Sequence, residues 1–193
     1  ENNGTVEVNS ETGEVEYTSL LNYNGDDWFT YTVTDDGGTP FNFEDDLTSL
    51  EDTIYVTVHG KNDFPIVDGD LSGTLNEDEG YFYFPLGEHS QDGDSLETNA
   101  DIQNLSYSIA FGDSASFGTL AIMEIQSAWY ARYDSDDDFH GDDSFTFTVT
   151  DDGETYNISE GEYQANSLQS SGTVQLTVLH INDIPEATTD SGP

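Results

Sequence analysis

The 193-residue sequence contains no cysteine and only two basic residues, Lys61 and Arg132. Without cysteine it forms no disulfide and no zinc–thiolate site, and this absence is ordinary for a secreted bacterial protein. The sequence has no apolar run of about 18 residues, so we expect no membrane insertion. It shows no secretory signal peptide and opens in the middle of a repeated pattern. We therefore expect a fragment or a processed product.

The two basic residues stand against 41 acidic ones, which gives a formal net charge of −39 at pH 7. Such a surface repels nucleic acid and anionic lipid, because their phosphates must be neutralised by Lys and Arg. It also repels itself, which destabilises the folded chain unless counter-ions offset the repulsion. Two explanations stay open and are compatible. One is a solvated acidic surface, as in proteins from salty habitats, and the other is specific binding of divalent cations.

An internal repeat organises the chain. Residues 24–37 match residues 140–153, which begin 116 residues later, with 11 of 14 positions identical. Residues 54–65 match residues 174–185 at a distance of 120 residues. The repeat predicts one incomplete module over residues 1–63, one complete module over residues 64–185, and a tail or the start of another module over residues 186–193.

Both copies alternate apolar and polar residues with a period of two, which is the pattern of a half-buried strand. In residues 144–150, for example, Phe145, Phe147 and Val149 alternate with serine and threonine. No segment carries a helical apolar stripe. Short strands separated by Gly, Asn and Asp predict an all-β, antiparallel sandwich. In the complete repeat we expect strands near 66–67, 71–76, 81–86, 105–111, 119–124, 128–133, 144–150 and 172–181, and a polar loop or hairpin over 154–171.

Acidic residues gather at the ends of the expected strands, often as Asp–Asp pairs. Calcium binds about six to eight oxygen ligands, which short carboxylates on tight loops supply. The loops at strand ends converge at one pole of a sandwich, so distant pairs form a site only in the folded protein. A single pair is also an ordinary turn or a solvated strand end. The recurrence of the same pairs at the same strand ends of both copies favours calcium binding.

Two motifs carry a resemblance to a known family. The first is Asn-Gly-Asp-Asp-x-Phe-Thr-[Tyr/Phe]-Thr-Val-Thr-Asp, which occupies 24–35 and, with His in place of Asn, 140–151. The second is Asn-Asp-x-Pro, at 62–65 and 182–185. With these motifs the chain resembles the cadherin-like tandem repeats of large bacterial calcium-binding surface adhesins. The resemblance implies tandem cadherin-like (immunoglobulin-like, Greek-key) β-sandwiches, the first one incomplete, with Ca²⁺ bound between successive modules.

The resemblance also implies two sets of calcium ligands. The set that joins the two repeats comprises Asp26, Asp27, Asn62, Asp63, Asp92, Asp94, Asn99 and Asp151. The set at the lower end of the second repeat comprises Glu77 or Glu79, Asp142, Asp143, Asn182 and Asp183. The family usually has an Asp two positions before the linker Asn, where this chain has Gly60 and His180. The number of ions at each junction therefore stays open.

We expect a calcium-rigidified structural or adhesive module of a secreted or cell-surface bacterial protein. Its partners would be neighbouring repeats, identical subunits, or glycans and proteins of a surface. No catalytic motif is present and the four histidines are scattered in the sequence, so we expect no enzyme.

Two alternatives remain. Residues 1–60 supply only about four strands, which leaves an apolar face incomplete. Either upstream chain or another subunit then supplies strands, and the second case predicts a strand-exchanging subunit of an extracellular filament. The other alternative is calcium-dependent carbohydrate binding through exposed aromatic side chains such as Trp28, Trp129 and Tyr133.

Overall fold

The computed structural model describes residues 3–39, 43–99, 102–109 and 112–185. Its regular elements over these ranges are β-strands and two short 3₁₀ helices, so the predicted all-β fold is confirmed. The chain divides into two compact units. Unit 1 comprises Glu1–Asn62, Asp94–Ile102 and Glu154–Ala165, and unit 2 comprises Asp63–Gly93, Gln103–Gly153 and Asn166–Pro193.

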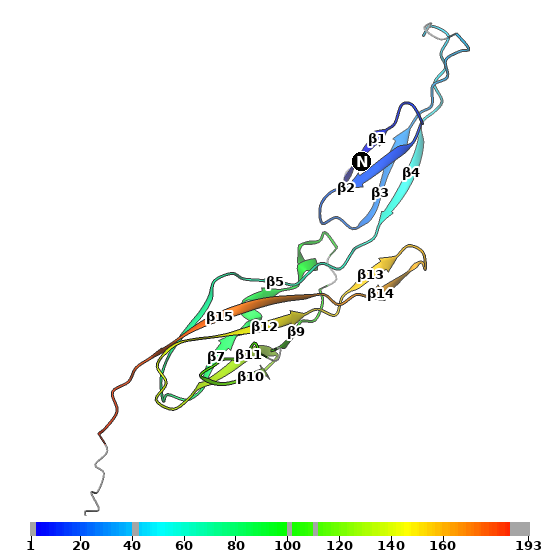
Figure 1. Cartoon of the computed structure of the whole chain (residues 1–193). Coiled ribbons are helices and arrows are strands. Elements are labelled where there is room, and N and C mark those ends of the chain that lie inside the picture. The colour runs from blue at the N-terminus through cyan, green and yellow to red at the C-terminus, as the bar shows by residue number, and fades with distance from the viewer. Residues whose placement is uncertain (1–2, 40–42, 100–101, 110–111, 186–193) are drawn as a thin grey trace, which may run out of the picture. The chain divides into compact units, whose positions relative to one another are not determined.

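Unit 2 contains two main β-sheets that enclose a core (Figure 1). One sheet has the strand order β6-β15-β12-β9 and the other has the order β10-β11-β7. Strand β6 runs parallel to β15, and the other pairs are antiparallel. The elements of this unit are β5 (Ile66–Val67), β6 (Leu71–Asn76), β7 (Phe82–Pro85), η1 (Leu86–Glu88), β8 (Ser90–Gln91), β9 (Ser106–Ser108), β10 (Gly118–Ile125), β11 (Ala128–Ser135), β12 (Gly141–Thr150) and β15 (Gln169–Leu179).

The core of unit 2 follows from the period-two pattern. On β12, Phe145 and Phe147 are buried while Thr146 between them is only partly covered. On β15, Val174 and Leu176 alternate with exposed residues in the same way. These side chains cluster with Phe84 and others from the opposite sheet. Burying one such apolar side chain contributes about 1.5–3 kcal/mol, so this interface holds the sandwich together.

Unit 1 contains two pairs of strands and a hairpin (Figure 1). The pairs are β1-β2 and β3-β4, both antiparallel. The inserted segment 154–171 includes the hairpin β13-β14, one of the two forms expected for it. The elements are β1 (Gly4–Val8), β2 (Val15–Ser19), β3 (Gly25–Tyr31), β4 (Asp52–Val58), β13 (Glu154–Asn157) and β14 (Glu162–Ala165), and η2 (Gly93–Leu96) includes residues of both units.

Unit 1 buries Phe29 but leaves exposed other apolar side chains on the same face, whose matches in unit 2 are buried. Tyr31 is 41% exposed, whereas Phe147, at the matching position of the second repeat, is 0% exposed. Ile54 is 38% exposed, and its match Val174 is 0% exposed. The described residues of unit 1 include no counterparts of β6, β7 and β9, the strands that complete the two sheets of unit 2. The first sandwich is therefore incomplete, as predicted.

The expected strands of the second repeat appear with small differences in their ends. Strand β9 is shorter than the expected 105–111, and residues 110–111 lie outside the described residues. Strand β15 begins at Gln169, earlier than expected, because Gln169 still pairs with Thr150 on β12. Strand β8 was not expected. The division of the sequence at residues 63 and 64 stays a prediction, and the predicted tail 186–193 lies outside the described residues.

Candidate metal centre

The buried polar side chains of the described residues coincide with the predicted ligands. They are Asp27, Asn62, Glu77, Asp92, Asp94, Asp143 and Asp151. The remaining predicted ligands, Asp26, Asp63, Glu79, Asn99, Asp142, Asn182 and Asp183, are exposed. A buried carboxylate is costly unless hydrogen bonds or a cation compensate it. Burial at these positions therefore calls for a specific partner at each one.

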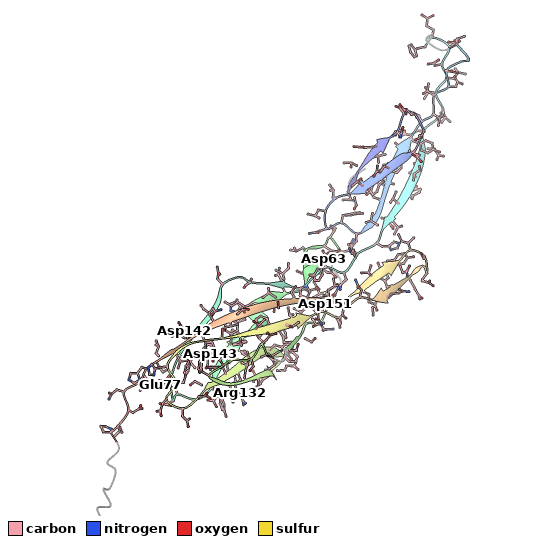
Figure 2. The ribbon with its side chains drawn as sticks, viewed as in Figure 1. Asp63, Glu77, Arg132, Asp142, Asp143 and Asp151 are labelled. Atoms are coloured by element: carbon pink, nitrogen blue, oxygen red, sulfur yellow. The ribbon has the colours of Figure 1, made fainter. Side chains whose placement is uncertain are left out.

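The predicted ligands of unit 2 lie toward its two ends. Figure 2 shows Glu77 and Asp142 near one end and Asp151 at the other. This separation follows from the ten-residue strand β12, because Asp142 is near its start and Asp151 comes directly after its end. Unit 2 also contains Asp63, Glu79, Asp92, Asp143, Asn182 and Asp183, and unit 1 contains Asp26, Asp27, Asn62, Asp94 and Asn99.

Asp143 accepts hydrogen bonds from inside its own repeat. The backbone N–H groups of Ser116, Phe117 and Ser144 donate to its carboxylate at 2.9, 3.0 and 2.8 Å. The hydroxyl of Tyr133 donates to it at 3.0 Å. Burial raises the pKa of Asp143, but the donors together outweigh burial and hold the pKa below its ordinary value. These contacts give Asp143 a structural role, and its predicted role as a ligand remains untested.

The same arrangement recurs in the first repeat. Asp27 accepts hydrogen bonds from the hydroxyl of Tyr17 at 2.8 Å and from the N–H of Trp28 at 2.9 Å. Burial, followed by the nearby Asp27 carboxylate, raises the pKa of Tyr17 to about 12. In each repeat the tyrosine precedes its aspartate by ten residues. A tyrosine hydroxyl bound to a buried aspartate is thus a repeated structural element.

Asp92 and Asp151 are buried in unit 2 and bind backbone groups of neighbouring loops. The N–H of Gln103 donates to Asp92 at 2.7 Å. The N–H groups of Gly153 and Leu168 donate to one oxygen of Asp151, at 3.1 and 2.9 Å. Asp92 is thus held by a neighbouring loop, and Asp151 has a fixed carboxylate at the end of the unit opposite to Glu77.

In unit 1, predicted ligands make contacts with segments that are distant in sequence. The N–H of Asn62 donates to the hydroxyl of Thr155 on β13 at 3.1 Å. Asn99 donates through its amide nitrogen to the carbonyl of Asn24 at 2.6 Å. The exposed Asp26 accepts a hydrogen bond from Thr57, its neighbour across β3 and β4, at 2.8 Å. These contacts hold the strand ends of the first repeat.

Glu77 is the centre of a cluster at the other end of unit 2. It is 1% exposed and directly follows β6. The hydrogen bond from the N–H of Ile181 is the largest influence on its pKa. This bond, with His180 and His140 nearby, holds the pKa of Glu77 below its ordinary value against the effect of burial. The carboxylate is therefore ionised at neutral pH.

Carboxylate oxygens of Glu77, Asp78 and Asp183 lie within 4.8 Å of one another. The sequence predicted Glu77 and Asp183 for a common site, and the structure brings these two together. It missed Asp78, which adopts a left-handed backbone with φ of 60° in the turn after β6. Asp and Asn tolerate this conformation better than other residues, so an Asp beside a strand-end Glu was the available signal. Glu79 is exposed and is not part of this cluster.

Comparison with known proteins assigns the chain. The family of bacterial Ig domains matches residues 1–42 and 62–177, most of the sequence. The chain belongs to the bacterial Ig domain family. The immunoglobulin-like fold was therefore predicted correctly. The match does not show that the chain is specifically a cadherin-like, calcium-binding adhesin repeat. Bacterial Ig domains are typically non-catalytic and occur on surface proteins. A search of the curated proteins found no match.

Similar solved structures include two endo-fucoidan hydrolases of glycoside hydrolase family 107. MfFcnA4 is 16% identical with a TM-score of 0.42, and the match covers 94% of this chain and 23% of that one. MfFcnA9 is 12% identical with a TM-score of 0.35, and the match covers 92% and 26%. The bacterial Ig chain thus spans about a quarter of the length of these enzymes. At these TM-scores the likeness carries no conclusion about activity.

Other features bear on the alternatives. In the ranges that the structure describes, no helix has the length and apolarity needed to span a bilayer. Tyr133, expected to be exposed for stacking on sugars, is fully buried in the core and donates its hydroxyl to Asp143, so this part of the carbohydrate hypothesis is wrong. Trp28 is exposed, and Trp129 packs against Tyr107 with ring centroids 5.6 Å apart. Carbohydrate binding through these two side chains stays a prediction.

Proposed function

We propose that this bacterial Ig chain is a calcium-rigidified structural module of a secreted or cell-surface protein. One observation carries the proposal: the buried polar side chains of the described residues are six carboxylates and one asparagine, all among the predicted ligands. Three carboxylates at one end of unit 2, from Glu77, Asp78 and Asp183, also lie close enough to share one ion.

The donor chemistry of this cluster fits calcium. Calcium takes about six to eight oxygen ligands from carboxylates, backbone carbonyls and water, at roughly 2.3–2.6 Å. Three carboxylates supply three to six of these oxygens, and Glu77 is held in place by its hydrogen bond from Ile181 at 2.7 Å. A divalent ion would also offset the mutual repulsion of these groups in a chain of net charge −39.

The consequence of binding is mechanical. Asp78 lies in the turn that follows β6, and Asp183 lies in the segment that leads out of β15. Carboxylates that share an ion would fix residues 180–185 against this turn, whereas the same carboxylates repel one another when no ion is present. The exit of the chain from unit 2 would then be rigid. Rigid exits of this kind suit a repeat that acts as a spacer on a surface.

Binding to the folded state alone also stabilises it, by about 2.7 kcal/mol when free calcium is 100 times the dissociation constant. The test is thermal unfolding with calcium or with a chelator at constant ionic strength. We expect calcium to raise the melting temperature of the wild type and of Glu79→Gln, and to have a much smaller effect on Glu77→Gln. Glu79→Gln is the matched control, because it removes the same charge two residues away. Equal melting temperatures with calcium and chelator in the wild type would sink the proposal.

The exposed apolar face of unit 1 favours a second candidate function, assembly by strand complementation with another copy of the chain. Tyr31 and Ile54 lie exposed at positions whose matches in unit 2 are completely buried. Strand β4 has β3 on one side, and among the described residues no strand pairs with its other edge. An open edge beside an apolar face is a template for pairing with another chain.

Light scattering over a range of protein concentrations tests this candidate. We expect oligomers whose size grows with concentration. Ile54→Lys should abolish them, because it places a charge on the apolar face. Tyr55→Lys should not, because Tyr55 is 81% exposed on the opposite face of β4. A monodisperse monomer at the highest concentration tested would exclude assembly through this face.

A further inference from the structure

Two histidines meet the buried Glu77 at one end of unit 2, and Glu77 also belongs to the carboxylate cluster with Asp78 and Asp183. Strands β6, β15 and β12 are neighbours in one sheet. Strands β6 and β15 are parallel, and β12 is antiparallel to them. The C-terminal ends of β6 and β15 and the N-terminal end of β12 therefore lie at the same end of the sheet. Glu77 follows β6, His180 follows β15 and His140 precedes β12. The topology therefore brings these three residues together.

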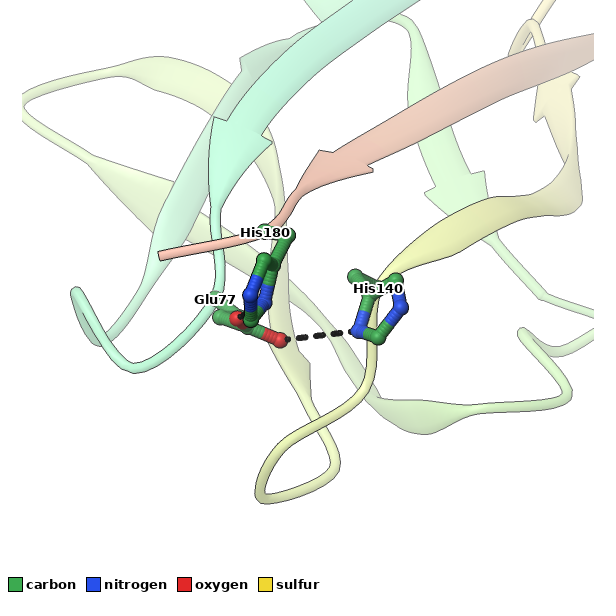
Figure 3. Close-up of side chains that lie close together, drawn as sticks. All are labelled: Glu77, His140 and His180. Carbon is green, nitrogen blue, oxygen red and sulfur yellow. Dashed lines mark hydrogen bonds and ion pairs between the residues drawn. The ribbon is translucent and has the colours of Figure 1, made fainter. Parts of the chain in front are cut away.

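Both imidazoles direct the same kind of atom at the carboxylate. The Nδ1 atom of His140 is 3.4 Å from one oxygen of Glu77, and the Nδ1 atom of His180 is 2.5 Å from the other. The imidazole rings lie 4.8 Å apart between centroids. Figure 3 shows the carboxylate beside His180 and directed toward His140. One ligand atom of each residue lies within 4.8 Å of the others.

The carboxylate is the unusual member of this group. Glu77 is 1% exposed, and its Oε2 atom accepts no hydrogen bond within the described part of the chain. That oxygen is the one that faces His140. A buried ionised oxygen without a hydrogen-bond donor is costly unless a positive charge compensates it. It therefore points to a cation at this position, either a protonated imidazole or a bound metal ion.

Imidazole nitrogens decide which class of metal ion fits. Calcium and magnesium prefer oxygen ligands, whereas zinc, copper and nickel bind imidazole readily. Ligand atoms around a tetrahedral zinc ion lie about 3.3–3.6 Å apart, since each is roughly 2.0–2.2 Å from the metal. The distance of 3.4 Å between His140 Nδ1 and Glu77 Oε2 matches this spacing. When a metal ion replaces the hydrogen bond between His180 Nδ1 and Glu77 Oε1, these two atoms would move apart.

We propose that Glu77, His140 and His180 form a three-ligand site for a divalent transition-metal ion of the zinc class. The imidazole side chains are 58% and 60% exposed, which leaves an entry path and room for water as the fourth ligand. The site is specific to the second repeat, because the first has Asn24 and Gly60 where the second has His140 and His180. The site shares Glu77 with the carboxylate cluster, and the two histidines are what distinguish it from the proposed calcium site.

Calorimetric titration of the whole chain with Zn²⁺, in calcium-free buffer at constant ionic strength, tests the proposal. We expect one zinc ion per chain. Even second-shell partners of a metal contribute about 10–100-fold, so His140→Asn and His180→Ala should each lower zinc affinity by at least tenfold. His140→Asn installs the residue of the first repeat. His59→Gln and His89→Gln are controls that should bind as the wild type does.

Both histidines are exposed, so their variants should fold, and circular dichroism checks this. A second measurement uses Co²⁺, whose intense visible absorption reports four-coordinate binding. The wild type should show this absorption, and the double variant His140→Asn/His180→Ala should not. Wild-type zinc affinity in the double variant would overturn the proposal, as would an equal loss in the two control variants. Because calcium stabilisation is measured separately through Glu79→Gln and the wild type, failure of the zinc site leaves the calcium proposal standing.

Discussion

Replacing Tyr133 with phenylalanine removes one hydroxyl group from the core of unit 2. This hydroxyl lies 3.0 Å from the carboxylate of Asp143 and 3.1 Å from the backbone carbonyl of Phe117. Its single proton goes to the stronger acceptor, the ionised carboxylate. The tyrosine ring is fully buried in the core, and phenylalanine fills almost the same volume. The substitution therefore tests one charge-assisted hydrogen bond with little change in packing.

A hydrogen bond to a charged group contributes about 1.5–3 kcal/mol to stability. Three backbone N–H groups still serve Asp143 in the variant, so the carboxylate is not left without donors. We therefore expect a loss near the lower end, about 2 kcal/mol, against a total of roughly 5–15 kcal/mol for a domain. For a unit of about 100 residues this corresponds to a fall in melting temperature of roughly 8 °C.

The assay is urea unfolding followed by tryptophan fluorescence. The chain has two tryptophans, and Trp28→Phe leaves Trp129 on β11 as the reporter for unit 2. Tyr130→Phe is the matched control, because it makes the same change on the same strand at a hydroxyl with no hydrogen bond in the described ranges. A loss below about 0.5 kcal/mol for Tyr133→Phe, or an equal loss in the control, would refute the reasoning.

The same comparison with and without calcium separates two roles of Asp143. If its oxygens are occupied by protein donors, the loss caused by Tyr133→Phe is the same under both conditions. If calcium binds Asp143, the ion replaces part of the lost interaction and the loss shrinks. We expect the loss to be unchanged.

Other consequences concern pH, backbone space and the hairpin. Burial raises the pKa of Asp143 in the folded state, but its hydrogen bonds outweigh burial and lower it. The contribution of Asp143 to stability should therefore be complete above about pH 4 and lost as the pH falls through the lowered pKa. Asp143→Asn should weaken this loss of stability at low pH, measured by unfolding curves. Gly118→Ala places a Cβ atom 2.4 Å from the backbone oxygen of Asp134 and should cost about 1–3 kcal/mol in urea unfolding. Tyr156→Ala removes a ring stacked 3.5 Å from His59 and should lower the stability of unit 1 by about 1 kcal/mol, seen through Trp28 in a Trp129→Phe background.

The strands could be predicted from the sequence because their pattern is local. The expected strand 71–76 agrees with β6, and alternation placed Phe145 and Phe147 on the buried face of β12. Strand ends were less predictable, since they depend on partners. Strand β15 extends back to Gln169 because β12 is long enough to pair with it, which the residues of 169–171 alone do not indicate.

The roles within each Asp–Asp pair could have been predicted further. Asp143 is in phase with Phe145 on β12 and therefore faces the core, whereas Asp142 faces solvent. The acceptor role of Asp143 could not be deduced, because its partner Tyr133 lies on a strand of the opposite sheet. The grouping of Glu77 with His140 and His180 was also inaccessible, since it requires the parallel pairing of β6 with β15.

The first repeat shows most clearly what local sequence leaves undetermined. Strand β4 alternates in the same way as β15, yet Ile54 is exposed and its match Val174 is buried. In unit 2 side chains of the opposite sheet such as Phe84 cover this face, and β6 donates to and accepts from the outer edge of β15. Hydrogen exchange tests whether the outer edge of β4 is open. We expect the amides of β15 to be protected on both edges, and those on the outer edge of β4 to exchange within seconds, as solvated backbone does. Equal protection of the two strands would mean that the edge of β4 is already covered in solution. Strand complementation by another copy predicts the same equal protection at high protein concentration. A dilution series separates the two cases, because protection supplied by another copy disappears on dilution and protection within one chain does not.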